Sequence, residues 1–155
     1  MKRGAAGFTL IEMVVTLTIV SVLAMAALPL AEGVMQYTRE RELNKALSEI
    51  RAALDRYKEA VDSGRVASAT PSGYPPSIEV LVSGVKDARA SGKLIYFLRR
   101  IPRDPFCPDG IEDAQCWGLR AYDTPPDAPA PGKDVYDVHS MSEEQGTDGR
   151  PYRSW

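Results

Sequence analysis

Apolar residues fill the first part of the chain without a clear period, and from Tyr37 onwards they recur with the period of a helix. Residues 8–30 are almost wholly apolar and, as a helix, are long enough to cross a bilayer core of roughly 30 Å. Further along, apolar residues recur at steps of four and three and predict one buried face of an amphipathic helix. These residues are Leu43, Leu47, Ile50, Leu54, Tyr57 and Val61. The pair Ser63 and Gly64 predicts the end of that helix.

The rest of the chain is broken by prolines and predicts a compact head with a small sheet. Eleven of the twelve prolines follow Thr70. Residues 77–82 predict a short helix, with a strand as the alternative, and the apolar run 93–98 fits either element. Two strands are expected, at residues 117–123 and 134–140, and residues 151–155 are a candidate third strand. The layout is therefore α+β, with a long helix packed on a small antiparallel sheet. A coiled-coil seam ranks second, because the apolar stripe covers under three heptads.

Composition limits the classes of function. The chain has 155 residues and 44% hydrophobic content, which suffices for one modest domain. Its net charge of −2 and pI near 5.5 argue against nucleic-acid binding through bulk charge. His139 is the only histidine, and the sequence shows no Gly-rich phosphate loop and no catalytic constellation around that residue. We therefore expect neither enzyme activity nor a nucleic-acid partner.

The apolar N-terminal run follows two basic residues. Because Lys2 and Arg3 precede it, the positive-inside rule puts the N-terminus in the cytoplasm and everything after Leu30 across the membrane. A secretory signal peptide is the alternative, since the small residues around Met25 are typical of a cleavage site. The run is longer than a usual signal core and continues into the amphipathic pattern, which favours a membrane anchor.

One carboxylate, Glu12, interrupts the apolar run near its start. Such a group costs on the order of 2.5–3.5 kcal/mol at membrane depth and less near a helix end, so it usually has a partner. If a peptidase cut after Gly7, the new amine of Phe8 would lie four residues before Glu12. Glu12 would then lie in the first turn, where the helix dipole favours an anion. The alternative is a carboxylate that snorkels to the membrane interface.

The stretch GFTLIE, residues 7–12, resembles the prepilin cleavage and methylation motif of type IV pilins and type II secretion pseudopilins. The resemblance implies that a prepilin peptidase cuts between Gly7 and Phe8 and methylates the Phe8 amine. It also implies that Glu12 pairs with the Phe8 amine of a neighbouring subunit in a filament. Pro29 falls where that family often has a proline, and it would kink or open the helix.

A second resemblance covers the head. Residues 74–75 (YP), 101–106 (IPRDPF) and 117–118 (WG) resemble the head of the major, G-type pseudopilin of type II secretion. That family has the pilin fold, which agrees with the expected α+β layout. The implied parts are a leader peptide at 1–7, a transmembrane and filament-core helix at 8–30, and an amphipathic helix with a periplasmic head at 31–155.

This resemblance implies a structural pseudopilin, single-pass in the bacterial inner membrane, with a cytoplasmic N-terminus and a periplasmic head. It would polymerise into a pseudopilus, a periplasmic filament that helps to export folded proteins. The implied partners are other copies of the chain, other pseudopilins, the prepilin peptidase and N-methyltransferase, inner-membrane assembly proteins, and membrane lipid before assembly. Two alternatives stay open: a type IV pilin for adhesion, motility or DNA uptake, and a membrane-tethered binding module that works as a monomer.

The G-type head normally carries a calcium-binding loop between its last strands. The corresponding region here lacks the paired glycines and the late Asp of that loop. Its oxygen donors are Asp137, Ser140, Glu143, Glu144 and Asp148. Calcium needs about six to eight oxygens, some of which backbone or water can supply, so calcium stays a candidate cofactor. A solvated acidic loop is the alternative.

Cys107 and Cys116 are the only cysteines. With the head outside the cytoplasm, a disulfide between them is chemically sensible, and its short loop would contribute about 2–3 kcal/mol by the chain-entropy estimate. A zinc pair is not expected, because the spacing is wrong and only one histidine is present. The bridge would connect the turn after Pro105 to the predicted strand at 117–123.

Overall fold

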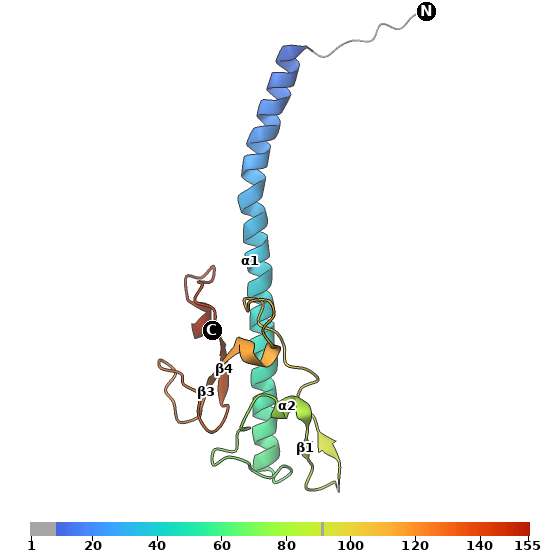
Figure 1. Cartoon of the computed structure of the whole chain (residues 1–155), viewed down its shortest axis with the longest axis vertical. Coiled ribbons are helices and arrows are strands. Elements are labelled where there is room, and N and C mark those ends of the chain that lie inside the picture. Colours follow the sequence, from blue (N-terminus) through green and yellow to red (C-terminus); the bar gives the residue numbers. More distant parts are fainter. Residues whose placement is uncertain (1–8, 91) are drawn as a thin grey trace, which may run out of the picture. The chain divides into compact units, whose positions relative to one another are not determined.

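A computed structural model describes residues 9–90 and 92–155, and it leaves the side chains of residues 26–32 undescribed. The chain divides into two compact units, Met1–Thr38 and Arg39–Trp155. In order, the elements are α1 (Leu10–Asp62), α2 (Val80–Ser83), β1 (Val85–Lys86), β2 (Leu94–Ile95), η1 (Asp113–Cys116), β3 (Trp117–Arg120), β4 (Asp137–Ser140) and η2 (Tyr152–Ser154) (Figure 1). A long helix with small antiparallel sheets is an α+β fold, which confirms the predicted class and is consistent with a pilin fold.

The second unit is built on the last part of α1, whose apolar stripe is buried. Five of the six predicted stripe residues are at most 2% exposed, and the sixth, Val61, packs partly buried against the core. Ala46 and Ala53 lie buried beside them, and their small side chains let the head approach the helix. The predicted amphipathic face is therefore confirmed, and burial of this face stabilises the helix against the head.

α1 ends where Ser63 and Gly64 predict. Gly64 has a φ of 68°, a left-handed backbone conformation that favours glycine. The Arg65 N–H donates a hydrogen bond to the Ala60 carbonyl at 2.8 Å. The Gly64 N–H donates one to the Val61 carbonyl at 2.9 Å. These two bonds make a Schellman motif, which satisfies carbonyls that a helix end leaves free.

The helical prediction for residues 77–82 is confirmed by α2, although this helix starts only at Val80. Gly84 follows it with a φ of 85° and leads into β1, which pairs antiparallel with β2. The Tyr96 ring lies so close that a Cβ on Gly84 would come within 2.7 Å of it. Both the backbone conformation and this contact require glycine between α2 and the first sheet.

The apolar run 93–98 contains a short strand and then turns into the core. After β2, the N–H groups of Phe97 and Leu98 both donate to the Leu81 carbonyl, at 3.0 and 2.9 Å. The Phe97 ring packs edge-on against Tyr57, with ring centroids 5.3 Å apart. The side chains of Phe97 and Leu98 are buried in the core, so the run leaves the sheet after the two residues of β2.

The second sheet pairs β3 with β4 in antiparallel register, with Trp117 opposite Ser140. Both strands lie inside the predicted segments 117–123 and 134–140 but are shorter, with four residues each. The sequence predicted one small sheet, whereas the described residues form two sheets of two strands.

The candidate third strand at residues 151–155 is wrong. The 3₁₀ turn η2 forms there, and an isolated bridge at Pro151 takes the place of a ladder. Proline has no N–H to donate to a neighbouring strand. Tyr152 is fully buried and stacks on Phe106 with ring centroids 4.0 Å apart, so burial of this ring outweighs strand pairing.

Candidate assembly site

α1 begins with a capped first turn that contains Glu12. The helix starts at Leu10, so Thr9 is the N-cap residue and Glu12 the third helical residue. The Glu12 N–H donates to Thr9 Oγ1 at 3.3 Å, and the Met13 N–H donates to the Thr9 carbonyl at 3.2 Å. A Thr followed three residues later by Glu has the spacing of a capping box. Glu12 thus lies where the helix dipole favours an anion.

The processing residues Gly7 and Phe8 lie outside the described residues, so the pairing of Glu12 with the Phe8 amine stays a prediction. The side chain of Pro29 is also outside the description, and the predicted kink stays a prediction. Within the part of the chain that the structure describes, no helix has the length and apolar character needed to cross a membrane.

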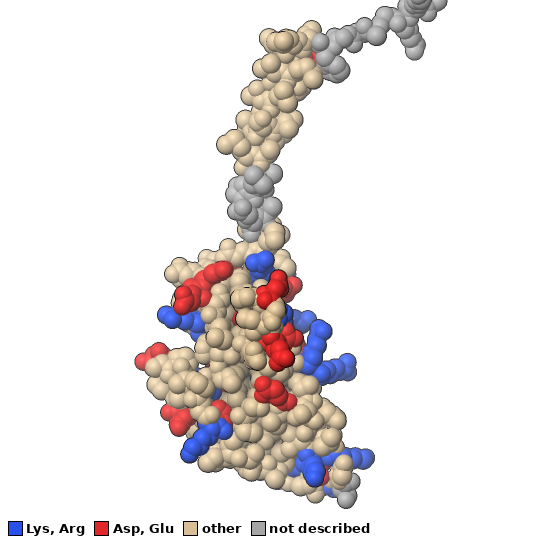
Figure 2. Space-filling model, viewed as in Figure 1, with Lys and Arg blue, Asp and Glu red and all other residues tan. Residues whose placement is uncertain are grey.

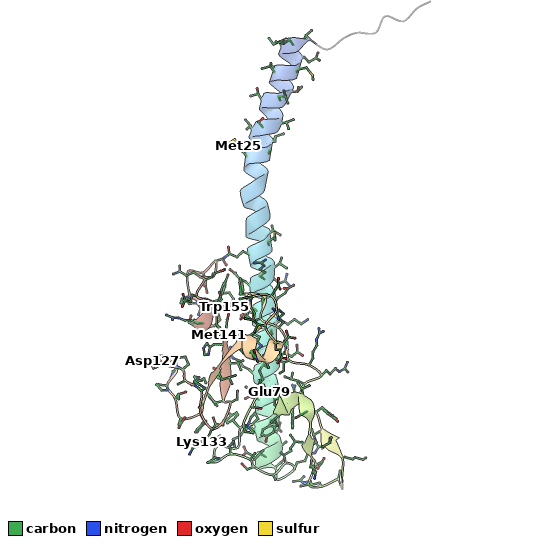
Figure 3. All side chains as sticks on the ribbon, in the orientation of Figure 1. Met25, Glu79, Asp127, Lys133, Met141 and Trp155 are labelled. Atoms are coloured by element: carbon green, nitrogen blue, oxygen red, sulfur yellow. A yellow bond between two sulfur atoms is a disulfide. The ribbon has the colours of Figure 1, made fainter. Side chains whose placement is uncertain are left out.

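Every described side chain from residue 9 to residue 25 is exposed. The large apolar ones range from 49% exposure at Val15 to 84% at Leu10. Figure 2 shows this stretch almost wholly tan, and Figure 3 shows side chains projecting on both sides of the ribbon down to Met25. Soluble monomers rarely leave so large an apolar surface uncovered, so this stretch has the character of an interaction surface.

The hydroxyl side chains of the same stretch are bonded to their own helix. Thr16, Thr18 and Ser21 donate to carbonyls one turn earlier, at 3.0, 2.8 and 2.7 Å. They are therefore satisfied without an outside partner. Glu12 is the only charged residue between residues 10 and 25. It is the one group in this surface whose burial calls for an opposite charge.

In the head, hydrogen bonds connect the IPRDPF stretch, residues 101–106, to the second sheet, and this contact is here called the joint. Asp104 is 1% exposed, and its Oδ1 accepts a hydrogen bond from the Phe106 N–H at 2.8 Å. Its Oδ2 accepts one from the Ser140 hydroxyl at 2.5 Å. The Trp117 indole N–H donates to the Pro102 carbonyl at 2.8 Å. The stretch therefore ties its loop to both β3 and β4, which is a structural role.

Cys107 and Cys116 form a disulfide with their Cα atoms 5.5 Å apart, which confirms the predicted bridge. Cys116 is the last residue of η1 and β3 follows directly. The bridge thus connects the turn after Pro105 to the strand, as predicted.

The candidate calcium ligands do not form a cluster. Asp137 pairs with Arg51 at 2.8 Å and with Arg120 at 3.3 Å. Asp148 pairs with Arg150 at 2.7 Å. Among the described residues, no group of three or more His, Cys, Asp or Glu side chains could hold a metal ion. No gathered ligand set therefore favours calcium over the alternative, a solvated acidic loop, and calcium binding stays untested.

Glu40 is a buried carboxylate that the sequence analysis missed. It is 5% exposed and accepts hydrogen bonds from the Thr147 N–H at 2.8 Å and the Thr147 hydroxyl at 2.7 Å. The Tyr152 hydroxyl donates a third bond at 3.1 Å. These bonds fasten the loop before η2 to α1. The helical spacing indicates the burial of Glu40, because Glu40 precedes Leu43 by three residues and so lies on the buried helix face.

His139 lies in β4 opposite Gly118 and is half-buried. Burial lowers the pKa of the imidazole below its ordinary value of 6.5. The Asp137 carboxylate opposes that shift, whereas the guanidinium groups of Arg51 and Arg120 add to the lowering of the pKa. A Cβ on Gly118 would come within 2.2 Å of the ring, so glycine makes room for it. His139 is therefore a packing residue of the second sheet.

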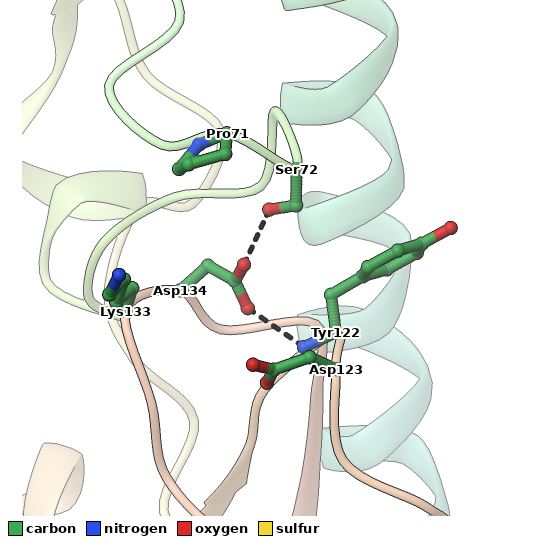
Figure 4. A pocket seen from close by; sticks show the side chains of 6 residues that line it. All are labelled: Pro71, Ser72, Tyr122, Asp123, Lys133 and Asp134. Carbon is green, nitrogen blue, oxygen red and sulfur yellow. Dashed lines mark hydrogen bonds between the residues drawn. The ribbon is translucent and has the colours of Figure 1, made fainter.

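A surface pocket of about 330 Å³ lies between two loops of the head (Figure 4). Its lining residues are Pro71, Ser72, Tyr122, Asp123, Lys133 and Asp134. Both oxygens of Asp134 accept hydrogen bonds, one from the Ser72 hydroxyl at 2.5 Å and the other from the Tyr122 N–H at 2.8 Å. This carboxylate joins the two loops and so has a structural role.

Comparison with known proteins gives one finding for the N-terminal segment. The family model of the prokaryotic N-terminal methylation motif matches residues 2–28, which include Gly7, Phe8 and Glu12. No curated protein and no solved structure matches the chain. The motif supports a type IV pilin-like family, whose members are structural subunits. It implies processing by a prepilin peptidase and assembly into a pilin-type filament.

Proposed function

We propose that the chain is the pseudopilin subunit of a type II secretion pseudopilus, which helps to export folded proteins. The observation that carries the proposal is Glu12, the one charge in an exposed apolar helix surface and part of its capped first turn. The methylation motif over residues 2–28 supports the processing that the proposal requires.

Processing supplies the partner that Glu12 needs. A cut between Gly7 and Phe8 leaves a cationic amine, and methylation of an amine keeps its charge. In the filament, the Glu12 carboxylate of one copy pairs with the Phe8 amine of its neighbour, which offsets the cost of taking both charges out of water. The apolar side chains of residues 10–25 then cover one another, as membrane lipid covers them before assembly.

The proposal puts the head in the bacterial periplasm and the helix across the inner membrane once. The disulfide between Cys107 and Cys116 supports this location, because disulfides persist in oxidising compartments. Lys2 and Arg3 support a cytoplasmic N-terminus. The proposed parts are the leader at 1–7, the spanning helix at 8–30, and the amphipathic helix with its head at 31–155.

The IPRDPF stretch favours secretion over the second candidate, a type IV pilin for adhesion, motility or DNA uptake. Strains that lack the chain separate the two candidates. Loss of exported proteins from the medium, with surface pili intact, supports the pseudopilin. Loss of pili with export intact contradicts the proposal and supports the pilin.

Electron microscopy of cells that overexpress the full chain tests filament formation. Wild type should give filaments and Glu12→Leu none, while mass spectrometry still shows the precursor cut after Gly7. Glu42→Leu removes an exposed carboxylate from the head part of α1 and is the matched control, which should assemble normally. Filaments of Glu12→Leu at the wild-type level, or no filaments of wild type, would refute the proposed function.

A further inference from the structure

A pocket of about 320 Å³ lies between the disulfide loop and the segment that follows β4, and it is here called the η1 pocket. Its lining includes Phe106, Ile111, Gln115, Cys116, Met141 and Ser142. The Met141 side chain (Figure 3) is 63% exposed and that of Ile111 is 38% exposed. The pocket thus offers an apolar surface that no other part of the described chain covers.

Four exposed carboxylates flank the η1 pocket in the sequence. They are Asp109, Glu112, Glu143 and Glu144. None of them forms an ion pair within the described residues. The Arg103 guanidinium of the same loop pairs with Asp113 at 3.1 Å and also donates to the carbonyls of Ile111 and Pro108 at 2.7 Å. The pocket therefore fits an apolar side chain that is surrounded by cations.

Strand β2 and its neighbours carry such a combination. Tyr96 is 60% exposed and Leu94 is 45% exposed. Four exposed cations near them form no ion pair within the described residues, and together with Tyr96 and Leu94 they are here called the basic tyrosine patch. These cations are Lys86, Lys93, Arg99 and Arg100.

Acidic side chains near the basic tyrosine patch are outnumbered. Asp87 is the only acid among residues 86–100, and it is buried and paired with Arg65 at 2.8 Å. Glu59 borders Tyr96, but Arg56 and Arg65 line the same hollow. The surroundings of Tyr96 are therefore basic.

We propose that Tyr96 of one copy of the chain inserts into the η1 pocket of a second copy. The pocket is large enough for one aromatic ring, and Phe106 and the Met141 thioether supply the contacts that such a ring favours. Gln115 offers a side-chain amide to the Tyr96 hydroxyl. The cations of the basic tyrosine patch then face the carboxylates around the pocket, so the ring supplies affinity and the charges fix its orientation.

The two surfaces lie at different levels and on different sides of α1. The strand β2 continues to Phe97, whose carbonyl accepts a hydrogen bond from the Arg56 guanidinium at 3.0 Å. In the pocket, Phe106 stacks on Tyr152, whose hydroxyl donates to Glu40 at 3.1 Å. Glu40 and Arg56 are 16 residues apart, which corresponds to about 24 Å along α1 and to nearly half a turn around it. Figure 1 likewise shows β1, the partner of β2, beside the C-terminal end of α1 and η1 further towards its N-terminus.

This separation makes the contact intermolecular and open-ended. Tyr96 cannot reach the η1 pocket of its own copy, and a copy that fills one neighbour's pocket keeps its own pocket for another neighbour. Such a heterologous contact produces a polymer when it does not close into a ring. The match of the two head surfaces does not depend on the proposed function, although a filament would hold the heads close together and so strengthen the contact.

Photo-cross-linking reads the contact directly. In cells that overexpress the full chain, p-benzoylphenylalanine replaces Tyr96, and mass spectrometry maps the cross-linked peptides. The expected product joins residue 96 to residues 107–116 or to Met141, and it must come from two copies, because the two surfaces lie about 24 Å apart along one helix. The same replacement at Tyr122, which is also 60% exposed, is the matched control and should give no product with the pocket. Absence of the product at residue 96, or products with other proteins only, would overturn the proposal.

Serine variants test the part that the ring plays in assembly. Tyr96→Ser should lower the yield of sheared filaments about tenfold, because it removes the aromatic anchor of the contact. Tyr122→Ser removes an equally exposed ring and should leave the yield unchanged. Equal yields for the two variants would overturn the proposal.

Charge variants test the match of the two surfaces. Arg99→Glu/Arg100→Glu removes the net charge of the basic tyrosine patch, and Glu143→Lys/Glu144→Lys removes that of the pocket surroundings. Each should lower the yield of the cross-linked product about fivefold at low salt. Lys133→Glu changes an exposed cation outside both surfaces and should leave the yield unchanged. Wild-type yields in both charge variants would overturn the proposal.

The cross-link also separates this inference from the proposed function. If wild type forms no filaments but its membranes give the product at residue 96, the proposed function fails and the contact stands. If filaments form and disappear in Glu12→Leu, but the product is absent from them, only the contact is overturned.

Discussion

Removal of the Asp104 carboxylate is the most informative perturbation of the head. In Asp104→Ala, two buried donors lose their acceptor, the Phe106 N–H and the Ser140 hydroxyl, which are bonded at 2.8 and 2.5 Å. Asp104 is 1% exposed and Ser140 is fully buried.

The cost follows from the two lost hydrogen bonds. A hydrogen bond to a charged group contributes roughly 1.5–3 kcal/mol, and an unpaired buried donor costs about 1–3 kcal/mol. We expect Asp104→Ala to lower the free energy of unfolding by about 3–5 kcal/mol. Asp104→Asn keeps one oxygen for the Phe106 N–H and offers an amide that can donate to the Ser140 hydroxyl. It should lower that free energy by only about 1–2 kcal/mol.

Urea unfolding of the full chain in mild detergent, followed by near-UV circular dichroism, measures these changes. The Trp117 indole is bonded to the Pro102 carbonyl in the same joint, so its signal reports on the joint itself. Asp127→Ala removes an exposed loop carboxylate (Figure 3) and should change the free energy of unfolding by less than about 0.5 kcal/mol. Equal effects of Asp104→Ala and Asp127→Ala would show that the hydrogen bonds of Asp104 do not stabilise the head.

Three further predictions concern the head. Cys107→Ser/Cys116→Ser should lower the free energy of unfolding by about 2–3 kcal/mol, because the disulfide is lost. A reductant should then have no further effect on the urea titration of the double variant, and a further effect would contradict this prediction. Burial lowers the pKa of His139, so the unfolded chain takes up the proton first and stability should fall as the pH drops below 6.5. His139→Gln should lose that part of the pH dependence of the melting temperature; an unchanged pH profile would contradict the assignment. Calorimetry at millimolar calcium should show no binding heat, because Asp137 and Asp148 are already paired with arginines; saturable heat would contradict this.

The helix was predictable because its signal is local and repeated. The stripe from Leu43 to Val61 follows the 3.6-residue period over several turns, and Ser63 and Gly64 carry the conformational preference that ends it. The place of Glu12 in the first turn was also predictable, since a single charge in an apolar run is visible without a structure, whereas its role in assembly stays a prediction. The disulfide followed from compartment and cysteine count.

The head was predictable only in outline, because long-range contacts decide its details. Asp55 lies one helical turn after Arg51. The Arg51 guanidinium nevertheless bonds Asp137 at 2.8 Å, the Val138 carbonyl at 3.1 Å and the Trp155 main-chain oxygen at 2.7 Å. Those partners lie 86 or more residues away in the sequence. No local pattern encodes such contacts.

The strand at the C-terminal segment was mispredicted for a related reason. Its alternating residues fit a strand, but Tyr152 is held in the core by Phe106 and by Glu40, two residues from distant parts of the chain. The loop before this segment, which holds some of the candidate calcium ligands, is fastened to α1 by the bonds between Glu40 and Thr147. A buried partner on another element thus fixes the position of each segment.

A cryo-electron microscopy map of the wild-type filament shows at once whether Glu12 acts as an assembly charge. The chain in the filament should begin at a methylated Phe8, with its amine within about 4 Å of the Glu12 carboxylate of an adjacent copy. A filament in which Glu12 faces solvent, or lies against apolar side chains with no amine in reach, would exclude this role of Glu12.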